Sequence, residues 1–207
     1  MPHIDYSKTF FKVLFVVGPT GSSASDLYNS FNEDFLLKTS FTESLNDLIT
    51  QIEKPSLKEY DDTFIERLIK EYQGIKNSRS IKEIIRRGLG LIVDATGISV
   101  EDLVNCERGF RSLGFDTSMI FINAPINSLN DSSIDAKKSW RELHENLGTF
   151  NSIFSDERFV VIDTFDFRRK ELKIKNLFLK SVKDLMFLKP RSPFTKKFHA
   201  YPTNLSG

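Results

Sequence analysis

The residues best placed to do chemistry form a glycine-containing turn from Gly18 to Ser25, which reads Gly-Pro-Thr-Gly-Ser-Ser-Ala-Ser. An apolar run at 13–17 precedes the turn, and a helical pattern follows it. This order is typical of a loop whose backbone N–H groups hold phosphate. The phosphate-binding pattern G-x-x-x-x-G-K-[ST], counted from Gly18, requires glycine at 23, lysine at 24 and a hydroxyl at 25. The chain has Ser23, Ala24 and Ser25, so we expect the scaffold of a nucleotide site without its main phosphate-binding charge.

A carboxylate in a second stretch is a candidate partner for Ser25. Residues 89–97 form an apolar run that leads to Asp94 and a tight turn at Gly97. An acidic residue at such a strand end holds Mg²⁺ or its waters in nucleotide-binding enzymes, because this hard cation prefers oxygen ligands. The alternative is that Asp94 is a turn residue or a helix N-cap, and spacing alone leaves both interpretations open.

Other reactive residues favour structural roles. The three histidines lie far apart in the sequence, and Cys106 sits in a helical pattern beside Glu107. These features argue against a zinc site and a cysteine nucleophile, so we predict no metal site and a buried structural cysteine. The basic runs Arg86-Arg87 and Arg168–Lys170 are typical of solvated faces.

The elements that must position these residues alternate between apolar strands and amphipathic helices. The patterns predict strands at 13–17, 35–37, 89–94, 119–122 and 159–163. They predict helices at 27–32, 42–52, 58–85, 100–113, 134–150 and 174–188. The alternation predicts an α/β fold: a parallel sheet of about five strands with helices on both faces.

The chain of 207 residues, 40% of them hydrophobic, is long enough for one domain, which we place at 1–188. Residues 189–202 then contain no acidic residue, four Lys or Arg and three prolines. We expect 189–207 to be an extended tail, because prolines disfavour a helix or a central strand. The residues predicted to bind a partner through this tail are Arg191, Phe194, Lys196, Lys197, Phe198 and Tyr201.

Charge and hydropathy indicate the compartment and the class of partner. Lys and Arg number 29 against 28 Asp and Glu, a formal charge of +1, so the total gives no argument for a nucleic-acid or membrane partner. A weaker reading is that the basic tail binds nucleic acid. No apolar run reaches about 18 residues, and the first residues lack signal-peptide features. These features predict a soluble protein that is not secreted.

Three further stretches carry a resemblance: 88–97 with its Asp-x-Thr-Gly segment, 113–123, and the tryptophan-containing run 138–150. Together with the Gly18 turn, over roughly positions 10 to 165, the chain resembles the zeta-toxin-like P-loop kinases of large tailed bacteriophages. The resemblance implies that Gly18 and Gly21 are loop glycines, that Ser25 supplies the magnesium hydroxyl, and that Asp94 belongs to the metal-binding strand end.

The chain departs from this family at three places. Ser23 and Ala24 replace glycine and lysine, Leu37 to Ser40 stands where the family has an acidic residue after the second strand, and 125–135 has no lid arginine. Phosphoryl transfer depends on positioning and charge neutralisation, and losing one such contact commonly costs a factor of about 10² to 10³ in rate. We therefore expect a fold retained without catalysis.

The resulting functional hypothesis is a catalytically inactive structural or protein-binding module without a cofactor. The phage resemblance implies a virion component of the neck, tail or capsid region, present in the host cytoplasm during assembly and anchored to other proteins by its tail. The alternative is an ATP- and Mg²⁺-dependent small-molecule or nucleotide kinase in which Lys12 or Lys38 replaces the missing lysine.

Overall fold

The computed structural model describes residues 9, 11–32, 36–40, 90–112, 114–130, 133–191 and 196. The helices predicted at 42–52 and 58–85 lie outside these residues. The tail residues Phe194, Lys197, Phe198 and Tyr201 also lie outside them.

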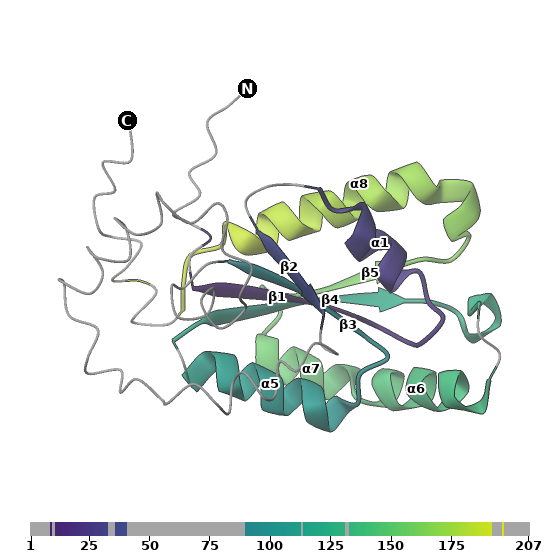
Figure 1. Cartoon of the computed structure of the whole chain (residues 1–207), viewed down its shortest axis with the longest axis horizontal. Helices are drawn as coiled ribbons and strands as arrows, with labels where there is room; N and C mark the ends of the chain where they lie inside the picture. Colours follow the sequence, from purple (N-terminus) through teal and green to yellow (C-terminus); the bar gives the residue numbers. More distant parts are fainter. Residues whose placement is uncertain are drawn as a thin grey trace.

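A twisted parallel sheet forms the centre of the molecule (Figure 1). Its strands are β1 (Lys12–Gly18), β2 (Leu37–Ser40), β3 (Leu91–Thr96), β4 (Asp116–Asn123) and β5 (Phe159–Asp163), in the order β2-β3-β1-β4-β5. Every residue of β1 is buried, as expected of a continuous apolar strand covered on both faces. Because the strands are parallel, the carboxyl ends of all of them lie at one edge of the sheet.

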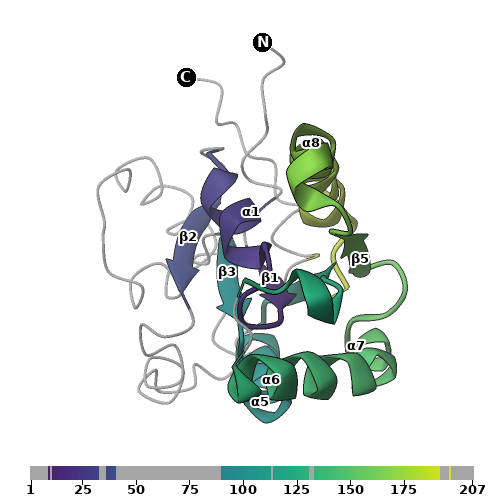
Figure 2. The same ribbon diagram turned by 90° about the vertical axis from the view of Figure 1, so that its right-hand side faces the viewer.

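Helices cover both faces of this sheet (Figures 1 and 2). One face carries α1 (Ala24–Ser30) and α8 (Phe167–Met186), which pack against the alternate β1 residues Leu14 and Val16. The other face carries α5 (Val100–Ser112), α6 (Ile134–Glu145) and α7 (Leu147–Phe154). Phe15 points to that second face, where it meets Phe110 and Phe154 edge-on. A short 3₁₀ turn, η3 (Ile126–Ser128), follows β4.

The predicted α/β architecture, a parallel sheet flanked by helices, is confirmed. Three helix predictions were wrong in detail. The helix expected at 27–32 is α1, which spans Ala24–Ser30. The helix expected at 134–150 is two helices, because Asn146 leaves helical geometry at φ −105° and ψ 10°. The last helix begins at Phe167 rather than at 174. The sequence did not indicate this earlier start, because the first two turns are mostly exposed and carry little apolar periodicity.

Strand β2 lies further along the chain than the sequence predicted. A strand was expected at 35–37, with Leu37 to Ser40 as the residues that follow it. The structure places these four residues in β2 itself, paired with Leu91 to Asp94 of β3. Residues after this strand begin at position 41 and lie outside the described part of the chain. The inferred loss of an acidic residue after the second strand therefore rested on a wrong strand boundary.

Candidate nucleotide-type site at the carboxyl edge

The Gly18–Ser25 loop connects the central strand β1 to α1 at the carboxyl edge of the sheet. The strand order reverses direction at β1, which lies between β3 and β4. Ligands of open α/β sheets bind outside the carboxyl ends of the strands at such a switch point. The loop is a tight turn in which the Ser22 amide donates to the Pro19 carbonyl at 3.0 Å, and Gly21 has φ 78°.

Serine at position 23 fits the turn without backbone strain. Its φ is −77° and its ψ is 12°, values open to any L-residue. The hydroxyl oxygen of Ser23 is buried and has no hydrogen-bond partner, so the side chain adds no bond to the loop. The neighbouring Ser22 hydroxyl, in contrast, bonds within the loop and accepts from the Ala24 amide at 3.3 Å.

Ser25, Asp94 and Thr96 form a hydrogen-bonded group across α1 and β3. The Ser25 hydroxyl donates to Asp94 Oδ2 at 3.1 Å and lies 3.2 Å from Thr96 Oγ1. The other carboxylate oxygen, Asp94 Oδ1, accepts from the Thr96 amide at 3.0 Å and from the Thr96 hydroxyl at 2.5 Å. The structure thus brings together the two residues expected to meet at a magnesium site, and both carboxylate oxygens already accept hydrogen bonds from the protein.

The turn after β3 packs directly on the loop after β1. Gly97 donates its amide to the Gly18 carbonyl at 2.8 Å. Its φ is 72°, and a Cβ at this position would lie 2.5 Å from Thr20 Oγ1. Gly18 is equally confined, since a Cβ there would lie 2.8 Å from the Ala24 Cβ and from Ser22 Oγ. The glycines therefore permit the close approach of the two turns.

Ala24, at the position of the phosphate-binding lysine, is fully buried among the apolar residues between the sheet and α8. The two lysines considered as substitutes are held elsewhere. Lys12 opens β1 at the opposite, amino edge of the sheet, where its Nζ donates to the carbonyls of Met186 and Leu188. Lys38 donates to the Asn29 carbonyl at 3.1 Å, and its Nζ lies 4.9 Å from the centre of the Tyr28 ring.

Residues that follow β4 in the chain also contact the Gly18–Ser25 loop. The Asn130 amide donates to the Gly21 carbonyl at 2.8 Å, and the Thr20 amide donates to Ser139 Oγ of α6 at 3.4 Å. The Trp140 indole fixes α6 to β4 by donating to the Ala124 carbonyl at 2.7 Å.

A polar chain continues from α6 to the end of β5. The ring of His144 stacks on Trp140 at 4.0 Å, and its Nε2 lies 2.8 Å from Asn123 Oδ1. The Asn123 amide nitrogen in turn donates to Asp163 Oδ1 at 2.5 Å. The ends of β4 and β5 are thereby tied to the helix that contacts the loop.

Sequence reasoning missed Thr96, Ser139 and Asn130 as part of this site. A signal for Thr96 was present, because residues two apart on a strand share a face and Thr96 stands two positions after Asp94. Ser139 and Asn130 come from separate segments, and no local pattern points to either of them.

Arg191, near the start of the predicted tail, contacts the domain that precedes it; we call these bonds the root contacts. The Arg191 amide donates to Asp116 Oδ2 at 2.8 Å, and its guanidinium donates to the Phe154 carbonyl at 3.0 Å. Lys196 is exposed. Of the residues predicted to bind a partner, Arg191 thus contacts the domain itself, and the role of the residues beyond it stays a prediction.

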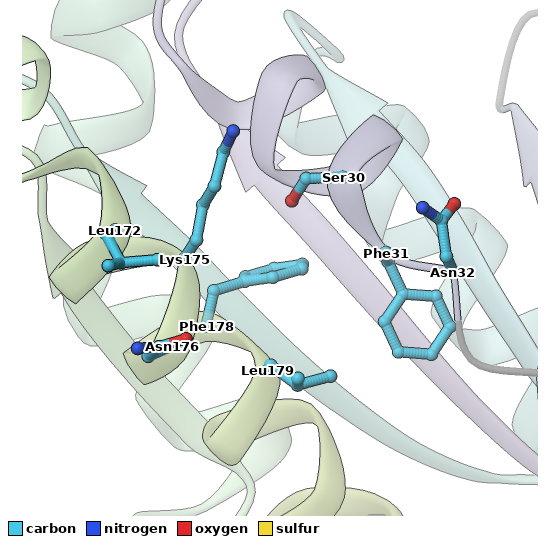
Figure 3. A pocket seen from close by; sticks show the side chains of 8 residues that line it. All are labelled: Ser30, Phe31, Asn32, Leu172, Lys175, Asn176, Phe178 and Leu179. Carbon is cyan, nitrogen blue, oxygen red and sulfur yellow. The ribbon is translucent and has the colours of Figure 1, made fainter.

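A groove of about 320 Å³ lies between the end of α1 and α8, away from the loop (Figure 3). Phe178 of α8 points toward Phe31 across it, with Leu179 beside them. Leu172 at its side is 75% exposed.

Cys106 is buried in α5, and burial together with the neighbouring Glu107 raises the pKa of its thiol. A raised thiol pKa disfavours the reactive thiolate, in agreement with the predicted structural role. Among the described residues, no group of three His, Cys, Asp or Glu side chains is arranged to hold a metal ion.

No protein-family model matches this chain, and no curated protein shows significant similarity to it. Within the described residues, none of the helices combines the length and the apolar character that crossing a membrane requires.

Proposed function

We propose that this chain is a non-catalytic P-loop kinase-like domain that serves as a structural or protein-binding module. The observation that carries the proposal is Ala24. The position that supplies the phosphate-binding cation is a fully buried methyl group, and neither Lys12 nor Lys38 reaches the loop. Catalysis of phosphoryl transfer consists largely of positioning and charge neutralisation, so a loop without this charge supports a scaffold role.

The contacts within the site support the same role. The three-way bond of Ser25, Asp94 and Thr96 links α1 to β3 and satisfies both oxygens of the carboxylate. Together with the bond between the turns at Gly97 and Gly18, it stabilises the carboxyl edge through contacts within the chain.

A second candidate function is an ATP-dependent kinase with a non-standard loop. One observation favours it: the Ser25 hydroxyl and the Asp94 carboxylate lie 3.1 Å apart at the switch point, where oxygen ligands for Mg²⁺ would be needed.

Calorimetric titration of the full chain with ATP and Mg²⁺ distinguishes the two functions. We expect no saturable heat. Saturable heat that is lost in both Ser25→Ala and Asp94→Ala, and kept in the exposed-site control Asp166→Ala, would show nucleotide binding at the loop and refute the scaffold proposal in favour of the second candidate.

The proposed assembly is a virion, an inference that rests on the resemblance to phage kinases alone. Mass spectrometry of purified particles from the source should detect the chain at a stoichiometry matching a structural component. A chain that ends at Arg191 keeps the root contacts and removes the rest of the tail. We expect it to fold but to be absent from the particles, and unchanged incorporation would refute anchoring by the tail.

A further inference from the structure

The amino edge of the sheet, opposite the loop, carries four charged side chains that we call the amino-edge cluster: Lys12, Asp116, Arg158 and Arg191. Lys12 opens β1 and is the register partner of Asp116, which opens β4. Arg158 immediately precedes β5, and Arg191 follows α8. The cluster therefore joins the sheet to the segment that leaves the last helix.

The cations of this cluster hold that segment by its backbone. Lys12 Nζ donates to the carbonyls of Met186 at 2.5 Å and Leu188 at 2.6 Å. Arg158 Nη2 donates to the Lys189 carbonyl. The bond to Lys189 uses one of the three nitrogens of the Arg158 guanidinium.

The other two guanidinium nitrogens of Arg158 are unpaired. The side chain is 2% exposed, and neither Nε nor Nη1 has a hydrogen-bond partner. A buried donor without a partner loses its hydration without compensation, and the penalty is larger for a charged group. Buried donors of this kind in folded proteins commonly pair with an ordered water or a bound ion.

The charge balance of the cluster indicates the sign of that acceptor. Lys12, Arg158 and Arg191 are three cations around the carboxylate of Asp116, and Glu157 is a second carboxylate that acts on Arg158. The neighbouring Arg111 is already paired with Glu107 at 2.5 Å. Burial, and after it the charge of Arg158, lower the pKa of Lys12 to about 8, while Asp116 acts in the opposite direction.

We propose that Arg158 binds an oxyanion, of the carboxylate or phosphate type, within the amino-edge cluster. A guanidinium is suited to this ligand because its N–H groups match the geometry of planar or tetrahedral oxyanions. The Lys189 carbonyl that accepts from Arg158 belongs to a short segment in which Lys189 and Arg191 are exposed. The proposal does not depend on the function assigned to the loop edge.

Thermal unfolding of the full chain in increasing sodium sulfate, phosphate or acetate tests the proposal, with ionic strength held constant by sodium chloride. We expect a saturable rise of the melting temperature, about 5 °C or more at 100 times Kd. The rise should vanish in Arg158→Met and persist in Arg168→Met, a matched change at an exposed arginine of α8.

The outcomes separate the sources of the anion. A response to acetate alone identifies a carboxylate, such as a protein side chain, whereas a response to sulfate and phosphate identifies a phosphate-type group. Equal rises in the wild type and Arg158→Met, or no saturable rise in the wild type, would overturn the proposal.

If Arg158→Met does not fold, nuclear magnetic resonance of the wild type decides the question. The Arg158 Nε–H signal, assigned by its absence in Arg158→Lys, should shift saturably with the same anions. A signal that stays in place while sulfate, phosphate and acetate are added would refute binding at this side chain.

Discussion

Lys12 makes the stability of this protein depend on alkaline pH in a predictable direction. Its side chain is 2% exposed, and burial and Arg158 lower its pKa from 10.5 to about 8. Between these two values the unfolded chain holds a proton on Lys12 that the folded chain has released. The unfolding free energy therefore rises with pH across this window. One pKa unit corresponds to about 1.4 kcal/mol, so the full effect is about 3 kcal/mol.

The measurement compares the wild type with Lys12→Met at several pH values from 7.5 to 10.5. Methionine keeps a long, unbranched chain but has no charge to titrate, so the difference in unfolding free energy isolates Lys12. This difference should change in favour of the wild type by up to about 3 kcal/mol, or about 6–12 °C in melting temperature for a chain of this size. At pH 7.5 the substitution removes a buried charge, which stabilises the fold, and leaves the carbonyls of Met186 and Leu188 without their donor, which destabilises it. The informative quantity is therefore the change of the stability difference with pH.

Urea unfolding followed by fluorescence is a suitable assay because Trp140 is the single tryptophan of the chain. Far-UV circular dichroism checks that the transition is global. Lys180→Met, at an exposed position of α8, is the control and should show no such pH dependence. The difference in unfolding free energy between wild type and Lys12→Met could instead stay constant, or change against the wild type, as pH rises. Either result would show that the pKa of Lys12 is not lowered in the folded protein.

Three further predictions concern the loop edge and the tail. Gly97→Ala should destabilise the protein by about 1–3 kcal/mol, because φ is positive and the added Cβ meets the neighbouring turn. The control Gly148→Ala, in α7 with nothing within 4 Å of the new Cβ, should stabilise by about 0.5–1 kcal/mol. Equal effects in urea unfolding would contradict this packing. Asp94→Ala should cost about 1–3 kcal/mol with no nucleotide present, since it leaves the Ser25 hydroxyl without its acceptor. A neutral result would show that the three-way bond is not structural. Ending the chain at Arg191 should change the melting temperature little, whereas ending it at 188 should lower it, and equal values would argue against the root contacts.

Much of the sheet follows from the sequence, because buried parallel strands are continuous apolar runs. β1 and β5 lie where these runs predict them, and the loop glycines and Ser25–Asp94 pair were identified by motif and position. The β2 boundary was wrong because its four residues, Leu-Lys-Thr-Ser, carry little apolar signal. Pairing with β3 defines that strand.

The amino-edge cluster could not be predicted in the same way. Arg158 follows Asp156 and Glu157 in a polar turn, where the local pattern indicates a solvent-exposed side chain. In the fold this side chain is buried, and its guanidinium donates to the backbone carbonyl of Lys189, which lies 31 positions along the chain. Neither periodicity nor a short motif contains information about a contact over that distance.

The bonds of Lys12 also set an order of events during synthesis. Lys12 lies in the central strand, yet its acceptors are 174 and 176 residues further along the chain. At about 5–20 residues per second, roughly 9–35 s pass before these carbonyls have been made. Until then the amino end of β1 must keep its ammonium group hydrated. The residues at the end of α8 and just after it thus complete the surroundings of a strand made well before them.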